Sequence, residues 1–264
     1  MCKIISSAVI IIGFIAAIMT GGTAFASHPL ITDDTGTQGK GKMQLEFIGE
    51  YGFEKEKGVT EKGLEVPTVP FLSYGVTDAV DLVVGLSYVS VEVEDAGTTT
   101  EVRGTTDMSV ELKARFYEKD GLSFAVKPGI SLPTGDEEKG LGNGRSSYSA
   151  FFITTKEAGP WAFHFNVGYI RNEYKLQADD EANRKDIWHV SLASQVAAAK
   201  DLHFVANIGM EQNSDVTSDV NPAFVLGGLV YAVSESMDLD FGVKGGLNKA
   251  ETDYTVLAGV TWKL

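Results

Sequence analysis

The chain has 264 residues, of which 44% are hydrophobic and 22% are charged, with 29 glycines and 7 prolines. These proportions fit one folded body of one or two domains and exclude a disordered or collagen-like chain. The 22 basic and 36 acidic residues give a formal net charge of −14. Because such a chain has no basic surface for a phosphate backbone, the composition argues against a nucleic-acid partner.

Residues 1–26 have the three parts of a secretory signal peptide. Lys3 supplies the positive start, an apolar stretch follows, and Ala24-Phe25-Ala26 provides a small-x-small cleavage triplet. An uncleaved membrane anchor is the alternative, but the segment is about as short as a span can be and carries a cleavage site. Cleavage predicts an exported mature chain that begins at Ser27 and has lost Cys2, the only cysteine.

The rest of the chain shows strand-type alternation. No later segment has the roughly 18 to 20 continuous apolar residues that a membrane-spanning helix needs. Residues 107–117 instead place apolar side chains at every second position and polar or charged ones between them, as in Val110-Glu111-Leu112-Lys113. Because successive side chains of a strand point to opposite faces, this segment predicts a strand with one apolar face and one charged face.

Segments of this kind recur along the chain with two types of connection between them. The predicted strands are 43–53, 64–74, 80–90, 106–117, 122–132, 147–156, 161–171, 186–197, 202–211, 222–232, 238–247 and 253–264. The links 75–79, 118–121, 157–160, 198–201 and 233–237 are short, whereas 54–63, 91–105, 133–146, 172–185 and 212–221 are long. Only the last link, 248–252, breaks this alternation. Short turns at one end and long loops at the other are typical of an outer-membrane barrel.

The predicted fold is therefore all-β: a transmembrane antiparallel up-and-down β-barrel of about 12 strands that follows a cleaved signal peptide. Residues 43–264 form the barrel, and residues 27–42 form an N-terminal periplasmic segment. The predicted location is the outer membrane of a cell with two membranes.

Large aromatic rings on the apolar parity gather at the ends of the predicted strands. They are Tyr51, Phe53, Tyr88, Tyr148, Tyr169, Trp188 and Tyr254 toward the long loops, and Tyr74, Phe116, Trp161, Tyr231 and Trp262 toward the short turns. Such rings favour the headgroup depth of a bilayer, so the pattern predicts two aromatic girdles. For any single ring, an ordinary core position at a strand end is the alternative.

The polar parity faces the lumen in this interpretation. The charged and histidine positions that we expect to line it are Glu46, Glu50, Asp107, Glu111, Lys113, Arg115, Lys127, His164, His189, His203, Asp240 and Lys244. Neutral polar positions include Asn166, Gln195 and Asn207, and apolar ones include Val69, Phe71, Val83, Phe151, Ile153, Phe224 and Leu226. A narrow lumen with mixed walls suits amphipathic solutes, and Lys113, Arg115 and Lys127 are expected to form a basic ladder within it.

The residues give little support to catalysis. His189 and Ser191 lie two residues apart on one strand face, where an imidazole can activate a hydroxyl. In lipid-hydrolysing barrels that pair faces the lipid, whereas apolar neighbours take that face here, so a polar network inside the lumen is the preferred interpretation. No cysteine and no tight ligand spacing accompany the histidines. The sequence predicts no catalytic site, no metal site and no cofactor.

Several segments together resemble a known family. They are His28-Pro-Leu-Ile-Thr-Asp-Asp-Thr-Gly-Thr-Gln-Gly-Lys-Gly-Lys42, Tyr74-Gly-Val-Thr-Asp-Ala-Val-Asp-Leu82, Lys127-Pro-Gly-Ile-Ser-Leu-Pro-Thr-Gly-Asp136, Gly140-Leu-Gly-Asn-Gly144, Asn166-Val-Gly-Tyr169 and Gly227-Gly-Leu-Val-Tyr231. They look like the outer-membrane transporter family labelled after the meta-cleavage pathway of phenol degradation. The resemblance implies a barrel that moves small, often aromatic or otherwise hydrophobic, compounds. None of the shared motifs is catalytic.

The expected function is an outer-membrane channel or facilitator for small, partly hydrophobic solutes, including aromatic ones, that cross by passive diffusion. The alternative is a closed structural or surface-binding barrel with a salt-bridged lumen. A soluble exported barrel that binds ligand inside is disfavoured, because soluble barrels are apolar within and polar outside.

The expected partners are outer-membrane lipid and lipopolysaccharide, the barrel-assembly machinery and a small-molecule solute. The chain stops inside its last predicted strand at Leu264. Outer-membrane proteins usually end in an aromatic residue, so this ending puts the efficiency of assembly in doubt.

Overall fold

The computed structural model describes residues 28–264, so the predicted signal peptide and Ser27 lie outside the described residues. The described chain consists of strands and loops, with one short 3₁₀ helix, η1 (Glu137–Lys139), and one short α-helix, α2 (Gln177–Ala182). No helix in residues 28–264 is long and apolar enough to cross a membrane.

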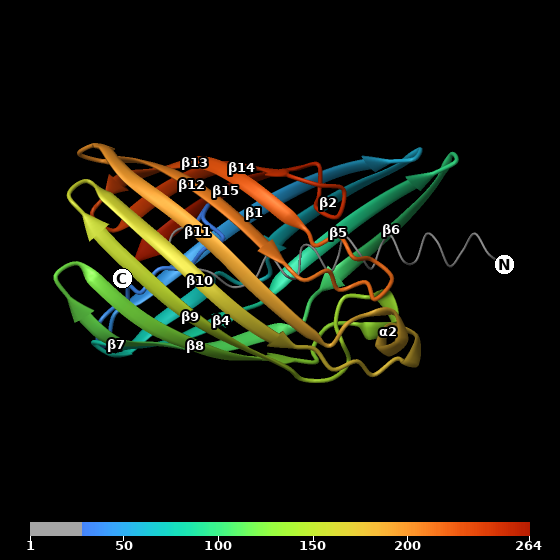
Figure 1. Cartoon of the computed structure of the whole chain (residues 1–264), viewed down its shortest axis with the longest axis horizontal. Helices are drawn as coiled ribbons and strands as arrows, with labels where there is room; N and C mark the ends of the chain where they lie inside the picture. The colour runs from blue at the N-terminus through green and yellow to red at the C-terminus, as the bar shows by residue number, and fades with distance from the viewer. Residues whose placement is uncertain (1–27) are drawn as a thin grey trace.

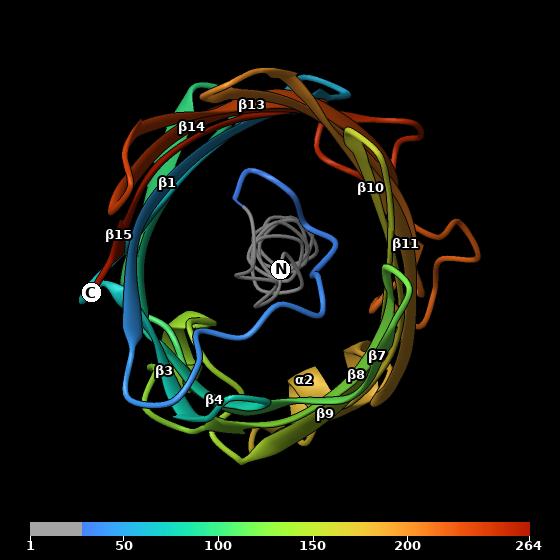
Figure 2. The ribbon, with the colours of Figure 1, turned by 90° about the vertical axis from the view of Figure 1, so that its left-hand side faces the viewer.

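Fifteen strand segments make one sheet. They are β1 (Met43–Glu56), β2 (Val59–Pro67), β3 (Phe71–Thr77), β4 (Val80–Gly85), β5 (Ser87–Asp95), β6 (Thr98–Thr105), β7 (Met108–Lys119), β8 (Leu122–Leu132), β9 (Ser147–Ala158), β10 (Trp161–Arg171), β11 (Asp186–Ala199), β12 (Leu202–Glu211), β13 (Ala223–Ser234), β14 (Met237–Gly246) and β15 (Tyr254–Lys263). All neighbouring segments pair antiparallel, and β15 pairs with β1, which closes the sheet into the ring of Figure 2.

Three neighbouring barrel strands are each made of two segments. β1 pairs with both β2 and β3, β2 pairs with β5 while β3 pairs with β4, and β6 and β7 follow in the same way. The interruptions fall at 68–70, Leu86 and 106–107. Because each pair of segments continues one strand of the barrel, the barrel has twelve strands, and the predicted fold is confirmed.

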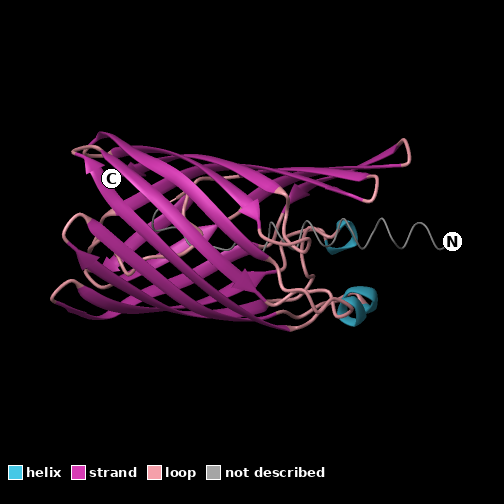
Figure 3. Cartoon of the chain, turned by 45° about the horizontal axis from the view of Figure 1, so that its top comes forward, coloured by secondary structure: helices cyan, strands magenta, loops and turns pink. Residues whose placement is uncertain are grey.

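Two of the predicted long links are strands. β1 and β2 continue to a tight turn at Lys57-Gly58, and β5 and β6 continue to one at Ala96-Gly97, with positive φ at all four residues. Such turns match the twist of a two-stranded hairpin. These hairpins project beyond the other strands at the long-loop end of the barrel (Figures 1 and 3).

The outer surface of the barrel carries the large apolar side chains. The eleven Tyr, Trp and Phe116 rings that the sequence assigns to the girdles are between 37% and 60% exposed, and Phe53 stacks on Tyr254. Exposed apolar residues such as Phe47, Leu112 and Val167 lie between the two rows. A contiguous apolar surface of this extent marks a surface that contacts lipid.

One expected lumen residue lies elsewhere. Val69 is 52% exposed, because it occupies the interruption between β2 and β3, where the alternation of side chains is broken.

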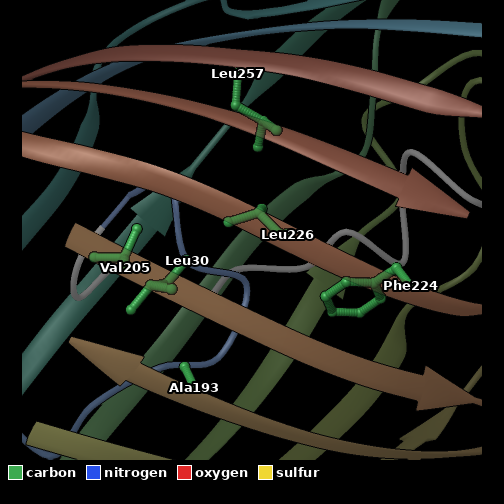
Figure 4. Packing of buried hydrophobic residues seen from close by; sticks show 6 residues of the cluster. All are labelled: Leu30, Ala193, Val205, Phe224, Leu226 and Leu257. Carbon is green, nitrogen blue, oxygen red and sulfur yellow. The ribbon is translucent and has the colours of Figure 1, made fainter.

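The N-terminal segment lies inside the barrel. Residues 28–38, blue in Figure 2, run across the interior before residues 39–42 lead into β1. The sequence predicted a periplasmic segment there, and the difference has a physical reason. Leu30 is buried against Ala193, Val205, Phe224, Leu226 and Leu257 of the barrel wall (Figure 4), so the lumen supplies the apolar contacts that an exposed segment would lack.

A glycine permits the segment to enter the barrel. A Cβ added to Gly75 would lie 1.8 Å from the carbonyl oxygen of Gly39, whereas a Cβ on Gly227 would meet nothing within 4 Å. We therefore expect Gly75→Ala to destabilise the folded barrel by roughly 1 to 3 kcal/mol through overpacking, and Gly227→Ala to leave stability nearly unchanged. The temperature at which the folded band disappears on a semi-native gel measures both effects. Equal midpoints for the two variants would contradict this account.

Candidate functional site: the barrel lumen

Two asparagines of the wall hold the backbone of the N-terminal segment. Asn207 on β12 accepts hydrogen bonds from the amides of Ile31 (2.8 Å) and Thr32 (3.0 Å) through Oδ1. Asn166 on β10 accepts one from the Asp33 amide at 2.7 Å and donates one to the Asp33 carbonyl at 2.9 Å. Both side chains therefore replace the sheet partners that this segment lacks.

A buried ion cluster fixes the middle of the segment. The Asp33 carboxylate lies 2.9 Å from the Nζ of Lys113 on β7 and 2.9 Å from the Nζ of Lys127 on β8. Lys127 also lies 3.5 Å from Glu111, and Lys113 donates a hydrogen bond to the carbonyl of Asp34 at 3.3 Å. Since charges in such a place need compensation, the segment supplies the negative charge that the two lysines require.

Four further charged positions of the predicted lumen also have partners. Asp240 pairs with His28, and Lys244 lies 3.0 Å from Glu251. Asp107 accepts hydrogen bonds from the amides of Gly135 and Asn143, both at 2.9 Å, and so holds the loop 133–146. Arg115 lies 3.3 Å from Glu118 at the short-turn end, beside a bulge in β7.

These contacts change the expected basic ladder. Lys113 and Lys127 meet at Asp33, but Arg115 binds Glu118 and the carbonyl of Asp78 and does not join them. The two lysines are neutralised inside the barrel instead of facing acids across an open lumen.

The three histidines of the lumen bind neighbouring polar side chains. His164 contacts Thr155 and His203 contacts Gln195, each at 3.0 Å. His189 lies 3.0 Å from the Ser191 hydroxyl and 3.3 Å from Glu211.

Ser191, His189 and Glu211 lie in the order of a nucleophile, a base and an orienting acid. However, Ser191 lies in mid-strand with paired neighbours on β10 and β12. The sheet thus uses the backbone amides around Ser191 that an oxyanion hole would need.

A stripe of carboxylates runs along the inner face of β1 and β2. Glu54 pairs across the strands with Glu61, and Glu50 pairs with Glu65. Glu46 continues the stripe on β1 and is 1% exposed. Sequence reasoning found Glu46 and Glu50 but missed the other three, because it placed Glu54 and Glu61 in a loop. Their symmetric spacing about the turn at Lys57-Gly58 was the available signal.

The pair Glu54 and Glu61, which is nearest the hairpin turn, lies beyond the exposed aromatic row that contains Tyr51. Burial raises the pKa of Glu61 to about 9, and the neighbouring carboxylate of Glu54 adds to this shift. Burial, followed by the carboxylates of Asp253, Glu56 and Glu251, raises the pKa of Glu54 to about 7. This part of the site therefore carries partial charge near neutral pH.

A valine stripe lies beside the carboxylates on β5. Val93, Val91 and Val89 are buried and pair with Glu61, Gly63 and Glu65 of β2. Leu141 of the loop 133–146 is buried against the same valines, so this loop folds inward. The lumen near the long loops thus has an acidic strip and an apolar strip side by side.

A closed antiparallel barrel with two exposed aromatic rows and a charged interior defines an outer-membrane β-barrel protein. Residues 31–264 match the family described as "Putative MetA-pathway of phenol degradation". The chain belongs to this family, which confirms the resemblance seen in the sequence. No curated protein matches the chain.

Solved structures with the same fold include an outer membrane channel from Pseudomonas putida F1, with a TM-score of 0.69 at 10% identity over 88% of this chain and 98% of that one. The NanC porin has a TM-score of 0.54 at 13% identity over 83% of this chain and 100% of that one. The translocator domain of the autotransporter NalP from Neisseria meningitidis has a TM-score of 0.50 at 9% identity over 86% of this chain and 89% of that one. At these identities the similarity is one of fold.

Asp33 supplies a test of the ion cluster. Asp33→Asn leaves two buried lysines with less compensation, so we expect a loss of roughly 3 to 5 kcal/mol in folding stability. Asp34→Asn is the matched control, because Asp34 is more exposed and lies 3.8 Å from Lys113. We expect less than about 1 kcal/mol from the control. Urea unfolding in detergent micelles measures both, and similar losses in the two variants would refute the central role of Asp33.

The pH dependence of stability tests the carboxylate pair of Glu54 and Glu61. The pKa of Glu61 is about 9 in the folded chain, against an ordinary value of 4.5, so the folded state keeps a proton that the unfolded state releases. Stability therefore falls as the pH rises from about 5 to about 9. We expect Glu61→Gln to lose part of this fall, whereas Glu94→Gln on the outer face of β5 keeps it. Unfolding in urea at about pH 6 and about pH 9.5 would show the difference.

Proposed function

We propose that the protein is an outer-membrane channel or facilitator that lets small, partly hydrophobic solutes, aromatic ones included, diffuse passively through a narrow lumen. The observation that carries this proposal is the pair of strips beside each other inside the barrel. Glu61 and Glu65 on β2 lie next to Val93 and Val89 on β5. A solute with a polar group and an apolar body finds a partner for each part along one path.

The N-terminal segment is the constriction in this proposal. Residues 28–38 are held by side chains of the barrel wall, principally those of Asn166, Asn207, Lys113 and Lys127. They are not held by a ladder of strand hydrogen bonds. The twelve-stranded ring closes through β15 and β1 without it. The segment therefore narrows the lumen while the wall depends on other contacts.

The proposed role is transport without catalysis. His189, Ser191 and Glu211 form a polar network on the wall, and the strand geometry around Ser191 favours this structural role. The proposed partners are the lipid and lipopolysaccharide around the barrel, the solute, and the assembly machinery that would engage the last strand. Leu264 exchanges backbone hydrogen bonds with Met43 at the closure of the ring.

A closed structural or surface-binding barrel is the second candidate. The cluster of Asp33, Lys113, Lys127 and Glu111 favours it, because a salt-bridged centre with an inserted segment can seal a narrow lumen. In this candidate the long loops carry the function by binding a partner at the cell surface.

Single-channel conductance distinguishes the two candidates. Residues 27–264, refolded in detergent and inserted into a planar bilayer, should give discrete current steps. A chain that lacks residues 27–38 should give steps several-fold larger, because conductance rises with the cross-section of the lumen. Semi-native gels of both proteins would establish that the barrels are folded. Silence from inserted barrels of both kinds would overturn the channel and favour the closed barrel.

A further inference from the structure

The charges inside the barrel do not balance locally. Lys113, Lys127 and Lys244 have carboxylate partners in Asp33, Glu111 and Glu251. The carboxylate stripe of β1 and β2 is different. Among the described residues, no basic side chain lies within 4.0 Å of its members Glu46, Glu50, Glu54, Glu61 and Glu65. The interior above the N-terminal segment is therefore acidic on one side.

Glu61, like Glu46, is a member of the stripe without a hydrogen-bond partner for its carboxyl group among the described residues. It is 2% exposed, and within residues 28–264 neither carboxylate oxygen has a hydrogen-bond partner. A buried polar group without a partner is costly and uncommon. Its cross-strand neighbour is a second carboxyl group, Glu54, and the two groups repel each other when both are ionised. A positive charge at this place would satisfy both groups.

Two glycines lie between the carboxylate pairs. Gly52 of β1 pairs with Gly63 of β2 at the level between the two carboxylate pairs, Glu54 with Glu61 and Glu50 with Glu65. Both glycines are buried and carry no side chains, so no side chain of β1 or β2 separates the two pairs. Each pair lies two residues away from this level, at a rise of about 3.4 Å per residue along the strand. A cation at this level lies between the two carboxylate pairs.

The neighbouring strand sets the kind of cation. Val91 of β5 pairs with Gly63, and Val93 and Val89 flank it, with Leu141 packed on the same cluster. An apolar wall offers no ligand to a metal ion, and no group of three or more ligand side chains in the described chain is arranged to hold one. An organic cation with an apolar body can place its charge at the glycine level and its body on the valines.

The charged groups around this place do not supply the missing cation. The positive charge of Lys244 acts on Glu65 at a distance, but Lys244 forms its ion pair with Glu251. Within the described part of the chain, Lys57 and Lys249 pair with Glu56 at the exposed tip of the β1–β2 hairpin. Lys62 points outward and pairs with Glu92.

We propose that the inner face of β1, β2 and β5, at the level of Gly52 and Gly63, binds organic ammonium ions that carry a ring-sized apolar group, and rejects the corresponding organic anions. This inference rests on the proposed channel and names the class of solute that it prefers. Glu54, Glu61, Glu50 and Glu65 hold the charge, and the valines of β5 hold the apolar group.

Equilibrium binding tests the inference separately from conductance. Isothermal titration of the refolded chain, residues 27–264, would use benzyltrimethylammonium, whose charge does not depend on pH, and benzoate. We expect benzyltrimethylammonium to bind at least about tenfold more tightly than benzoate. Equal binding of the two probes, or tighter binding of benzoate, would overturn the proposal.

Matched variants locate the site. The double variant Glu54→Gln and Glu61→Gln should weaken binding of the cation by at least about tenfold. The control Glu94→Gln and Glu101→Gln removes the same charge from the outer faces of β5 and β6, where both side chains are exposed, and should leave binding unchanged. Unaltered binding in the first variant would also overturn the proposal.

A second route applies if that double variant fails to fold on a semi-native gel. Val91→Lys places a tethered ammonium beside Gly63 and should abolish binding by occupying the site, and retained binding would refute the proposal. A barrel that binds the cation but carries no current removes the channel and keeps this inference. A barrel that conducts without preferring the cation keeps the channel and removes the inference.

Discussion

The contact of Asp33 with Lys113 and Lys127 determines the charge of the barrel interior. Two ammonium groups that are buried in a narrow lumen need a negative partner, and the N-terminal segment delivers it at 2.9 Å to each. Because these lysines pair with the segment and with Glu111, they form no ion pair with the acids of β1 and β2. One carboxylate of an irregular segment thus leaves the carboxylate stripe without an ion-pair partner among these lysines.

The strands were predictable because lipid imposes a pattern on them. A strand between lipid and a polar lumen must alternate, and β8, β10 and β12 have the bounds expected from the sequence. The prediction failed in the β1–β2 and β5–β6 hairpins. Beyond the aromatic row the outer face is wet, as Lys62 and Glu92 show, so the apolar parity disappears while the strands continue. The alternation of apolar and polar side chains, which identifies the barrel strands, therefore does not show how far these two hairpins extend.

The lumen was predictable only in part, for a geometric reason. Period two assigns a side chain to a face but gives neither its height nor its partner, so Lys113, Lys127 and Arg115 looked alike. Arg115 lies two residues nearer the short-turn end than Lys113, just before a bulge in β7, and pairs there with Glu118. The course of residues 28–38 has no periodicity at all. The periodicity of the strands therefore could not place Leu30 and Asp33 inside the barrel.

The glycines of β1 and β2 connect the fold to the proposed selectivity. Gly52 and Gly63 face each other between the two carboxylate pairs, and any larger side chains there would separate those pairs from a bound charge. Four like charges on two adjacent strands oppose one another, so the stripe weakens the folded barrel when it is fully ionised. A cation relieves that repulsion. The barrel and the solute are then coupled through the same groups, because whatever occupies the glycine level stabilises the wall that holds it.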